Sequence, residues 1–163
     1  TVARRLGYGD GIIARGIEKA KLRARFEIAD GDPVVILDGA HTADSVAACA
    51  DDFRTLFPSG GRLVFGCAKG KPPRPMAAAL RGAFGEVIVT KPGTFKESDT
   101  AEIEAAFVAE GFAVRRTDDT EEAIKAALAS ASAEGSPLLV TGSFYLCAAA
   151  AALIDPSRST GRG

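Results

Sequence analysis

Polar and small residues that directly follow a short apolar run have the types and spacing to bind a ligand. The run is Val34–Leu37, and it is followed by Asp38, Gly39, Ala40 and His41, the only histidine of the chain. A β-branched run of this length is typical of a strand buried on both faces, and a helix pattern begins after His41. Such a turn places polar groups at the carboxyl end of a strand, where open α/β sheets bind ligands. A carboxylate there can accept hydrogen bonds from ligand hydroxyl groups, and an imidazole can orient a phosphate.

Each of these residues also has a purely structural interpretation. Asp38 could cap a turn or a helix, and His41 could be satisfied within its own turn. Gly39 would let a backbone approach a ligand, but any tight turn needs the same small residue. Position alone does not separate these interpretations from the functional ones.

Two downstream turns carry further polar side chains. Lys69 and Lys71 follow a strand predicted at 62–67, and Ser143 follows a strand predicted at 137–141. The lysines would lie on the ligand edge of the sheet, although a charged loop is commonly just solvated. Ser143 suits the cap of the following helix, whose N-terminal amides could also face an anion.

The elements that must position these residues alternate between strands and helices. The predicted strands are 23–29, 34–37, 62–67, 86–90, 112–116 and 137–141. The predicted helices begin after Asp10, at Thr42 or Asp44, at Met76, at Asp99 or Thr100, at Glu121 and at Phe144. This order predicts an α/β, Rossmann-like fold, with a doubly wound, mostly parallel sheet of about six strands and helices on both faces. The connection from 29 to 34 is too short for a crossover, so we expect the first strand to be antiparallel.

The length of 163 residues fits one domain over 1–163, with a linker arm at 1–9 and a flexible tail at 155–163. The chain begins at Thr1, and we therefore expect it to be a piece of a longer protein. Hydrophobic residues make up 47% and charged residues 25%, as in a soluble globular protein.

Charge and cysteine usage exclude several classes of function. A net charge of −1 gives no electrostatic reason to bind nucleic acid or an anionic membrane. No apolar run approaches the roughly 20 residues of a membrane span, and no signal peptide is visible. The three cysteines are scattered, which favours free thiols in a reducing cytoplasm, and a single histidine without paired cysteines does not match the ligand set of a zinc site.

Four segments share their order and spacing with one known family. They are Arg25-Phe26-Glu27, Ile36-Leu37-Asp38-Gly39-Ala40-His41, Phe65-Gly66-Cys67-Ala68-Lys69-Gly70-Lys71 and Thr141-Gly142-Ser143-Phe144-Tyr145. The chain resembles the C-terminal domain of folylpolyglutamate synthase and dihydrofolate synthase, of the Mur ligase superfamily. That family reads GR-E, P-ILDGAHNP, FG--KDKD and TGS-Y. The resemblance extends from about Gly11 to Ala152.

The resemblance implies an ATP-dependent carboxylate–amine ligase. Such enzymes use ATP to phosphorylate a carboxylate of a folate or dihydropteroate acceptor, and the amine of L-glutamate then attacks the acyl phosphate. Their P-loop, their Mg²⁺ ligands and their folate pocket lie mostly in a larger N-terminal domain, and no G-x-x-x-x-G-K-[ST] occurs here. We therefore expect this domain to be inactive alone and to close over ATP in the full enzyme.

The resemblance also assigns roles to the nucleotide side of the site. It implies that Arg25 reaches the triphosphate when the domains close, although an arginine in a basic segment is otherwise simply solvated. Asp38 would accept from the ribose hydroxyls, and Gly39 would allow close approach. His41 would orient the nucleotide or a phosphate, and His41 and Lys71 would be the catalytic residues.

On the substrate side, the resemblance implies that Lys69 and Ser143 help bind glutamate, and that this domain holds no metal itself. Two departures leave the acceptor and the activity open. The Asn-Pro of the family is Thr42-Ala43 here, and the acids flanking its loop lysine are Gly70 and Pro72.

Other functions are weighed against this one. A stand-alone nucleotide-binding module would need G-x-G-x-x-G after its first parallel strand, and the turn at 38–43 reads DGAHTA. A receiver-type signalling domain would need paired acids after that strand, and only Asp38 is present. A divergent Mur-type ligase with another acceptor is the remaining alternative.

Overall fold

The structure is a computed structural model, and it describes residues 23–29, 31–94 and 96–155. The strands in this part of the chain are β1 (Glu27–Ala29), β2 (Val35–Asp38), β3 (Arg62–Phe65), β4 (Glu86–Val89), β5 (Ala113–Arg116) and β6 (Leu138–Thr141). The helices are α3 (Ala43–Leu56), α4 (Pro73–Leu80), α5 (Thr100–Ala109), α6 (Thr120–Glu134) and α7 (Phe144–Ile154). The predicted helix after Asp10, the linker arm at 1–9 and residues 156–163 of the predicted tail lie outside the described residues.

The described strands form one six-stranded sheet in the order β1-β2-β6-β3-β4-β5. β1 is antiparallel to β2, and every other neighbouring pair is parallel. The predicted mostly parallel sheet with one reversed strand is therefore confirmed. In the register, Thr141 at the end of β6 lies opposite Asp38 on one side and Phe65 on the other. The carboxyl ends of β2, β6 and β3 are thus level with each other.

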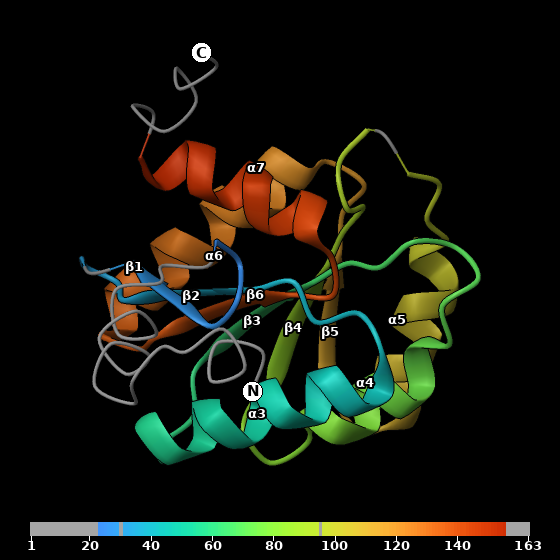
Figure 1. Ribbon diagram of the computed structural model, residues 1–163, viewed down its shortest axis with the longest axis horizontal. Helices are drawn as coiled ribbons and strands as arrows, with labels where there is room; N and C mark the ends of the chain where they lie inside the picture. Colours follow the sequence, from blue (N-terminus) through green and yellow to red (C-terminus); the bar gives the residue numbers. More distant parts are fainter. Residues whose placement is uncertain (1–22, 30, 95, 156–163) are drawn as a thin grey trace, which may run out of the picture.

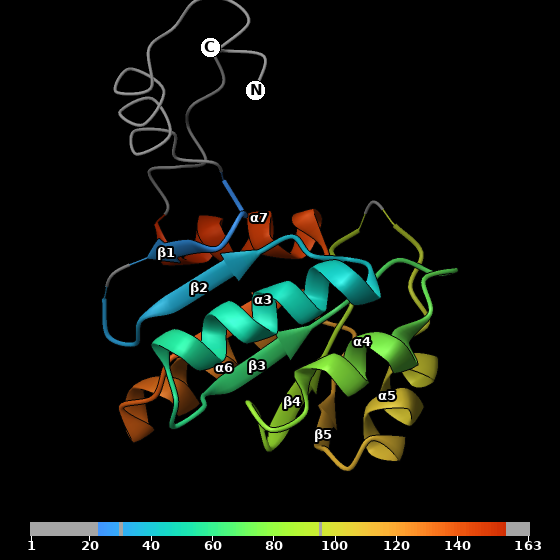
Figure 2. The same ribbon diagram turned by 60° about the horizontal axis from the view of Figure 1, so that its bottom comes forward.

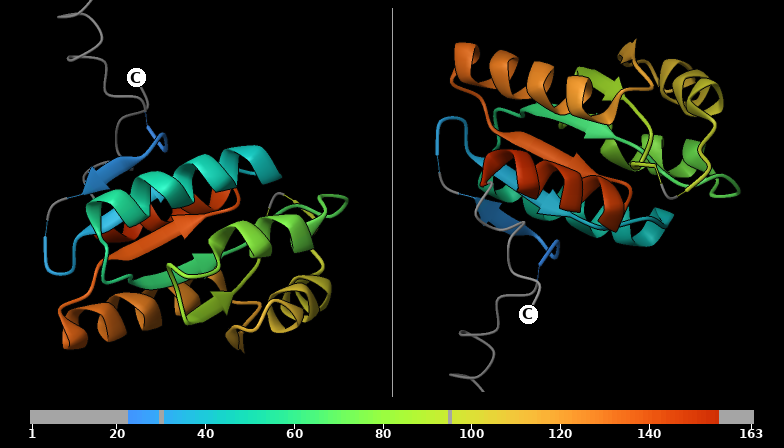
Figure 3. Two further views of the ribbon diagram at one scale, coloured as in Figure 1. Left: turned by 90° about the horizontal axis from the view of Figure 1, so that it is seen from below. Right: turned by 90° about the horizontal axis from the view of Figure 1, so that it is seen from above.

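Helices cover both faces of the sheet, as the sequence predicts. Helices α3, α4 and α5 pack on one face, and α6 and α7 pack on the other (Figures 1 and 2). Successive strand residues alternate between the two cores, because side chains along a strand point to opposite faces. Ile36 belongs to the core under α3, while Val35 and Leu37 belong to the core under α6 and α7. Views from below and above show these two layers in turn (Figure 3).

Two elements begin three or more residues away from their predicted starts, while the bounds of the others agree within one or two residues. The predicted strand 23–29 is a strand only at Glu27–Ala29, and Ala24 and Phe26 have positive φ angles of 51° and 45°. This segment turns because Ala24 accepts a hydrogen bond from the Gly39 backbone at 2.8 Å, which bends it over the end of β2. Helix α4 begins at Pro73 rather than at Met76. Prolines suit the first turn of a helix, where their missing N–H groups have no intrahelical partner.

None of the helices in the described part of the chain is long and apolar enough to cross a membrane.

Candidate functional site

Asp38 uses both carboxylate oxygens to hold the turns around the end of β2. Its Oδ1 accepts a hydrogen bond from the backbone N–H of Ala40 at 2.7 Å. Its Oδ2 accepts one from the backbone N–H of Phe26, also at 2.7 Å. The half-buried carboxylate therefore fastens the turn that carries Arg25 to the end of the strand that precedes His41.

Phe144, the first residue of α7, connects two of the predicted site residues. The guanidinium carbon of Arg25 lies 4.7 Å from the centroid of the Phe144 ring, which is a cation–π contact. The His41 ring meets the same phenyl ring edge-on, with centroids 5.8 Å apart. A Cβ atom at Gly39 would overlap the Phe144 ring. Gly39 is therefore required for the packing of this aromatic ring.

The His41 ring is held by its own turn. Its Nδ1 lies 2.8 Å from the Gly39 carbonyl oxygen, and a carbonyl only accepts hydrogen bonds. Nδ1 therefore carries the hydrogen, so that in the neutral ring Nε2 is left as an acceptor. The backbone N–H of His41 donates to Ser45 Oγ at 3.1 Å, which fixes the position of the ring at the start of α3.

Side chains from three neighbouring strand ends surround one cavity of about 590 Å³. His41 comes from the turn after β2, Lys69 and Lys71 from the turn after β3, and Ser143 from the turn after β6. The remaining lining residues are Ala68, Gly70, Lys96, Glu97, Gly142, Phe144 and Tyr145. The cavity lies where neighbouring parallel strands connect in opposite directions, which is the usual ligand position in doubly wound sheets.

The turn after β6 is built by backbone geometry and a cap. Gly142 has a φ of 100°, a conformation that residues with a Cβ atom rarely adopt. Ser143 is nearly buried and caps α7, because its Oγ accepts from the backbone N–H of Tyr145 at 3.2 Å. The structural interpretation of Ser143 is thus realised, and the residue also borders the cavity.

The lysine loop after β3 is tied to a second loop. The backbone N–H of Lys69 donates to the Glu97 carbonyl at 2.8 Å. The Lys69 ammonium lies 3.8 Å from the Glu97 carboxylate, and both side chains are largely exposed. Lys71 closes a turn with the Ala68 carbonyl at 3.2 Å. The cationic side of the cavity is therefore solvent-accessible.

The structure brings four of the seven predicted site residues to the cavity wall. These are His41, Lys69, Lys71 and Ser143. The other three, Arg25, Asp38 and Gly39, do not line it. They adjoin it through Phe144 and the turn after β2, as described above. Sequence reasoning did not single out Phe144, Lys96 or Glu97.

A larger cleft of about 1510 Å³ adjoins this cavity. The two share Lys69, Lys96, Glu97 and Tyr145. One wall of the cleft is a stripe of α7 that consists of Tyr145, Ala148, Ala149, Ala152 and Leu153. The other wall comes from the connection between β4 and α5 and from the start of α6. The sequence signals for this wall are only a loop pattern at 92–98 and capping residues at 117–120.

The described residues contain no group of three or more histidine, cysteine, aspartate or glutamate side chains that could hold a metal ion. The three cysteines are buried. Loss of solvation raises the pKa of the Cys49 and Cys67 thiols from 9.0 to about 12, and it raises the pKa of Cys147 as well. Thiols with such pKa values stay protonated at neutral pH and are poor nucleophiles.

Comparison with known proteins gives a family match over most of the chain. The family model for the Mur ligase glutamate ligase domain matches residues 24–144. The folylpolyglutamate synthase of Lacticaseibacillus casei is 31% identical over 138 residues, which is 84% of this chain and 31% of that protein. The UDP-N-acetylmuramoyl-L-alanyl-D-glutamate–2,6-diaminopimelate ligase of Chlamydia felis is 35% identical over 118 residues, which is 68% of this chain and 24% of that protein.

A solved structure also matches this chain over most of its length. The solved structure of E. coli FolC in complex with DHPP and ADP matches this chain with a TM-score of 0.79 at 25% identity. The match covers 92% of this chain and 35% of that chain. The chain spans about a sixth to a third of the length of the curated relatives it matches, from 16% of one to 31% of another.

Proposed function

The chain belongs to the Mur ligase family through its glutamate ligase domain, and from that premise we propose that it is the C-terminal domain of an ATP-dependent folate:L-glutamate amide ligase. The observation that carries this proposal is the convergence of His41, Lys71 and Ser143 on one cavity at the carboxyl edge of the sheet. A volume of about 590 Å³ falls within the range of small-molecule sites, roughly 300–1,000 Å³. The proposed domain occupies 1–163.

On the nucleotide side, charged and hydrogen-bonding side chains surround the turn that follows β2. Arg25 is exposed and stacks on Phe144, so its guanidinium is available to a phosphate on a facing domain. Asp38 fixes the turn of Arg25 through the Phe26 amide and has lone pairs left for ribose hydroxyls. The Nε2 atom of His41 is left to orient the nucleotide.

ATP supplies the phosphoryl group that activates the acceptor carboxylate. The residues present fit a nucleotide, because cationic and hydrogen-bonding groups line the cavity. The described residues hold no cluster of three or more histidine, cysteine, aspartate or glutamate side chains that could bind a metal. As the family resemblance implies, we assign Mg²⁺ mainly to a P-loop domain of the full protein.

On the substrate side, we assign L-glutamate to Lys69 and to the start of α7. The helix presents its N-terminal amides and the Ser143 cap to the cavity, and a helix N-terminus favours a carboxylate. Lys71 lines the cavity on the same loop as Lys69, and we assign it the role of stabilising charge that develops on the transferred phosphoryl group. We propose folate or dihydropteroate as the acceptor and the cytoplasm as the location, since free thiols such as these stay reduced there.

The test is an assay of the full-length protein with ATP, L-glutamate and each pterin acceptor in turn. We expect ADP release that requires both L-glutamate and one of the acceptors, with a new amide bond in the product. ADP release that is independent of the amine would contradict the assignment. So would the absence of an amide product with every acceptor.

A second candidate is a divergent Mur-type ligase with another acceptor and a different amine. It is favoured by the 35% identity to a diaminopimelate ligase over 118 residues. The same assay separates the two candidates when the pterin acceptor is replaced by UDP-N-acetylmuramoyl-L-alanyl-D-glutamate and L-glutamate by 2,6-diaminopimelate. A product with diaminopimelate alone would select the second candidate.

A further inference from the structure

The connection between β4 and α5 forms a wall that the two cavities share. Lys96 and Glu97 border both cavities, while Lys91, Gly93 and Thr94 border only the larger cleft. The position of this connection therefore sets the shape of the cleft next to the proposed glutamate site.

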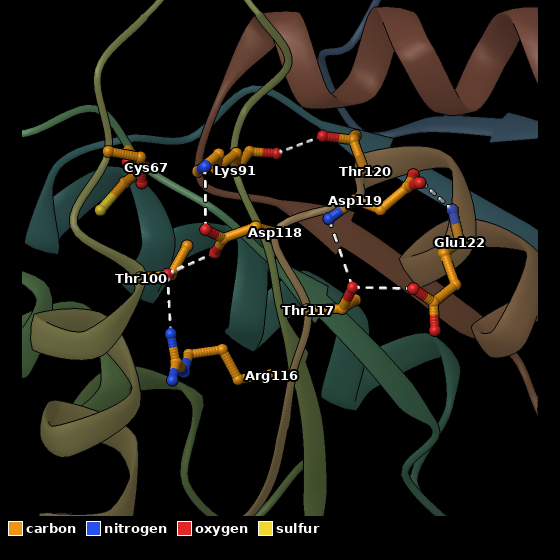
Figure 4. A network of polar contacts seen from close by, with 10 residues as sticks. Cys67, Lys91, Thr100, Arg116, Thr117, Asp118, Asp119, Thr120 and Glu122 are labelled. Carbon is orange, nitrogen blue, oxygen red and sulfur yellow. Dashed lines mark hydrogen bonds and ion pairs between the residues drawn. The ribbon is translucent and has the colours of Figure 1, made fainter.

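The described ends of this connection are held by tertiary contacts (Figure 4). At its start, the Lys91 ammonium lies 2.8 Å from Asp118 Oδ2. The Lys91 carbonyl also accepts from Thr120 Oγ1 at 2.9 Å. At its end, Ser98 Oγ donates to the Cys67 carbonyl at 2.7 Å. Asp118 and Thr120 follow β5, and Cys67 follows β3. The connection is therefore held by residues at the ends of the two strands that flank β4 in the sheet.

Asp118 is the one side chain in this described network that binds both ends of the connection. Its Oδ2 holds Lys91, and its Oδ1 accepts from Thr100 Oγ1 at 2.7 Å. Thr100 is the first residue of α5 and is buried, with an exposed fraction of 5%. The hydrogen bond from Lys91, followed by that from Thr100, lowers the pKa of Asp118 below its ordinary value. The carboxylate is therefore charged at neutral pH.

We propose that Asp118 is a positioning residue for the amine substrate. It holds Lys91 and Thr100 on its two oxygens, and it thereby fixes the wall of the cleft and places the Lys91 ammonium in it. This inference rests on the proposed ligase function and adds Lys91 as the cation that Asp118 orients toward an anionic amino acid.

The ion pair is poorly suited to a role in stability alone. The Lys91 and Asp118 side chains are 41% and 52% exposed. Exposed ion pairs contribute little to folding, because water and salt screen them. Removing the charge of Asp118 should therefore leave the fold intact, while Lys91 and the connection between β4 and α5 lose their fixed position.

The experiment measures steady-state kinetics of the full-length protein with Asp118→Asn. We expect the KM for L-glutamate to rise about tenfold, while kcat and the KM for ATP change by less than about twofold. Asp118→Glu, which keeps the charge, should give a KM between those of the wild type and Asp118→Asn. Asp51→Asn is the matched control, because Asp51 also forms an exposed ion pair, with Arg54 at 2.7 Å and with side chains 77% and 36% exposed. It does not line the cleft and should leave the KM unchanged.

A double variant separates positioning from direct contact. If Asp118 acts through Lys91, Asp118→Asn causes no further change in a Lys91→Met background. A further rise in KM there would show that Asp118 does not act through Lys91, and it would overturn the proposed orientation of Lys91. An unchanged KM in Asp118→Asn, or an equal rise in the KM for ATP, would overturn it too. A wild-type protein that forms no amide with glutamate would overturn the proposed function first, and this inference with it.

Discussion

At the scale of single residues, Gly39 matches the glycine of the family motif, but the structure gives a different reason for the glycine than the sequence suggests. The sequence suggests a small residue that lets a ligand approach the backbone. The structure shows that the missing side chain leaves room for the Phe144 ring, on which Arg25 stacks. The packing partner lies 105 positions away in the sequence (144 − 39), so no local pattern could reveal it.

Gly39→Ala should therefore destabilise the protein. The added methyl group overlaps the Phe144 ring, and overpacking of this kind costs about 1–3 kcal/mol. Gly85→Ala is the matched control, because a Cβ atom at Gly85 meets nothing within 4 Å. The measurement is the free energy of unfolding in urea for both variants. Equal stabilities of the two variants would show that Phe144 moves aside freely.

The buried thiols predict how stability depends on alkaline pH. The pKa of Cys49 and of Cys67 is raised from 9.0 to about 12 in the folded protein. Between pH 9 and pH 12 the unfolded chain therefore binds fewer protons than the folded one. Stability must fall as the pH rises through this range.

The check on the thiols is urea unfolding at a series of pH values from 7 upward. Cys49→Ala removes one of the raised thiols and should show a shallower fall in the free energy of unfolding above pH 9. An identical slope in the wild type and in Cys49→Ala would mean that the thiol ionises equally in both states.

At the scale of elements, the start of α3 explains one departure from the family pattern. Thr42 is the N-cap, and its Oγ1 accepts from the backbone N–H of Ser45 at 3.3 Å. The Ser45 hydroxyl in turn accepts from the backbone N–H groups of His41 and Thr42, each at 3.1 Å. Asparagine is also a good N-cap, and proline suits the next position. Thr42-Ala43 therefore caps and begins the helix in the way that Asn-Pro would.

Thr42→Ala should lower the free energy of unfolding by about 1 kcal/mol, because the helix loses its cap. The double variant Thr42→Asn/Ala43→Pro should retain the wild-type stability within about 0.5 kcal/mol. Urea unfolding of the two variants tests this. A double variant as unstable as Thr42→Ala would show that the capping equivalence is wrong.

The elements also show how far the sequence predicts the fold. Apolar periodicity was sufficient for β2, β3, β4 and β6, because most of their residues are buried between two helical layers. The edge strand β5 was predicted as well, although most of its residues are exposed. Periodicity failed at 23–26, where alternation suggested a strand, because contacts with Gly39 and Asp38 impose positive φ angles instead. It also placed α4 too late, because prolines were interpreted as a loop although they suit a first helical turn.

At the scale of the whole molecule, the site is predictable only where it depends on strand ends. Parallel strands bring His41, Lys71 and Ser143 to one edge, which a topology inferred from sequence can foresee. The wall that contains Lys91 depends on Asp118 and Thr120, which follow a different strand. Its formation is a matter of side-chain contacts between loops, and these leave no periodic signal.

The isolated 163-residue chain should bind ATP weakly or not at all. The described residues form one side of the proposed nucleotide site, and a P-loop is absent from the sequence. Calorimetric titration of the chain with ATP should give no affinity tighter than about micromolar. A submicromolar constant would favour a stand-alone nucleotide-binding module over a domain that completes a shared site.

The most direct test of the account is the dissociation constant of ADP for the full-length protein and its His41→Ala variant. We expect the variant to bind ADP at least about tenfold more weakly, since loss of a hydrogen bond to a charged group costs roughly 1.5–3 kcal/mol. Asp44→Asn, an exposed position in the same helix turn, is the control and should bind as the wild type does. Equal ADP affinity in the wild type and His41→Ala would contradict the claim that this edge of the sheet completes the nucleotide site.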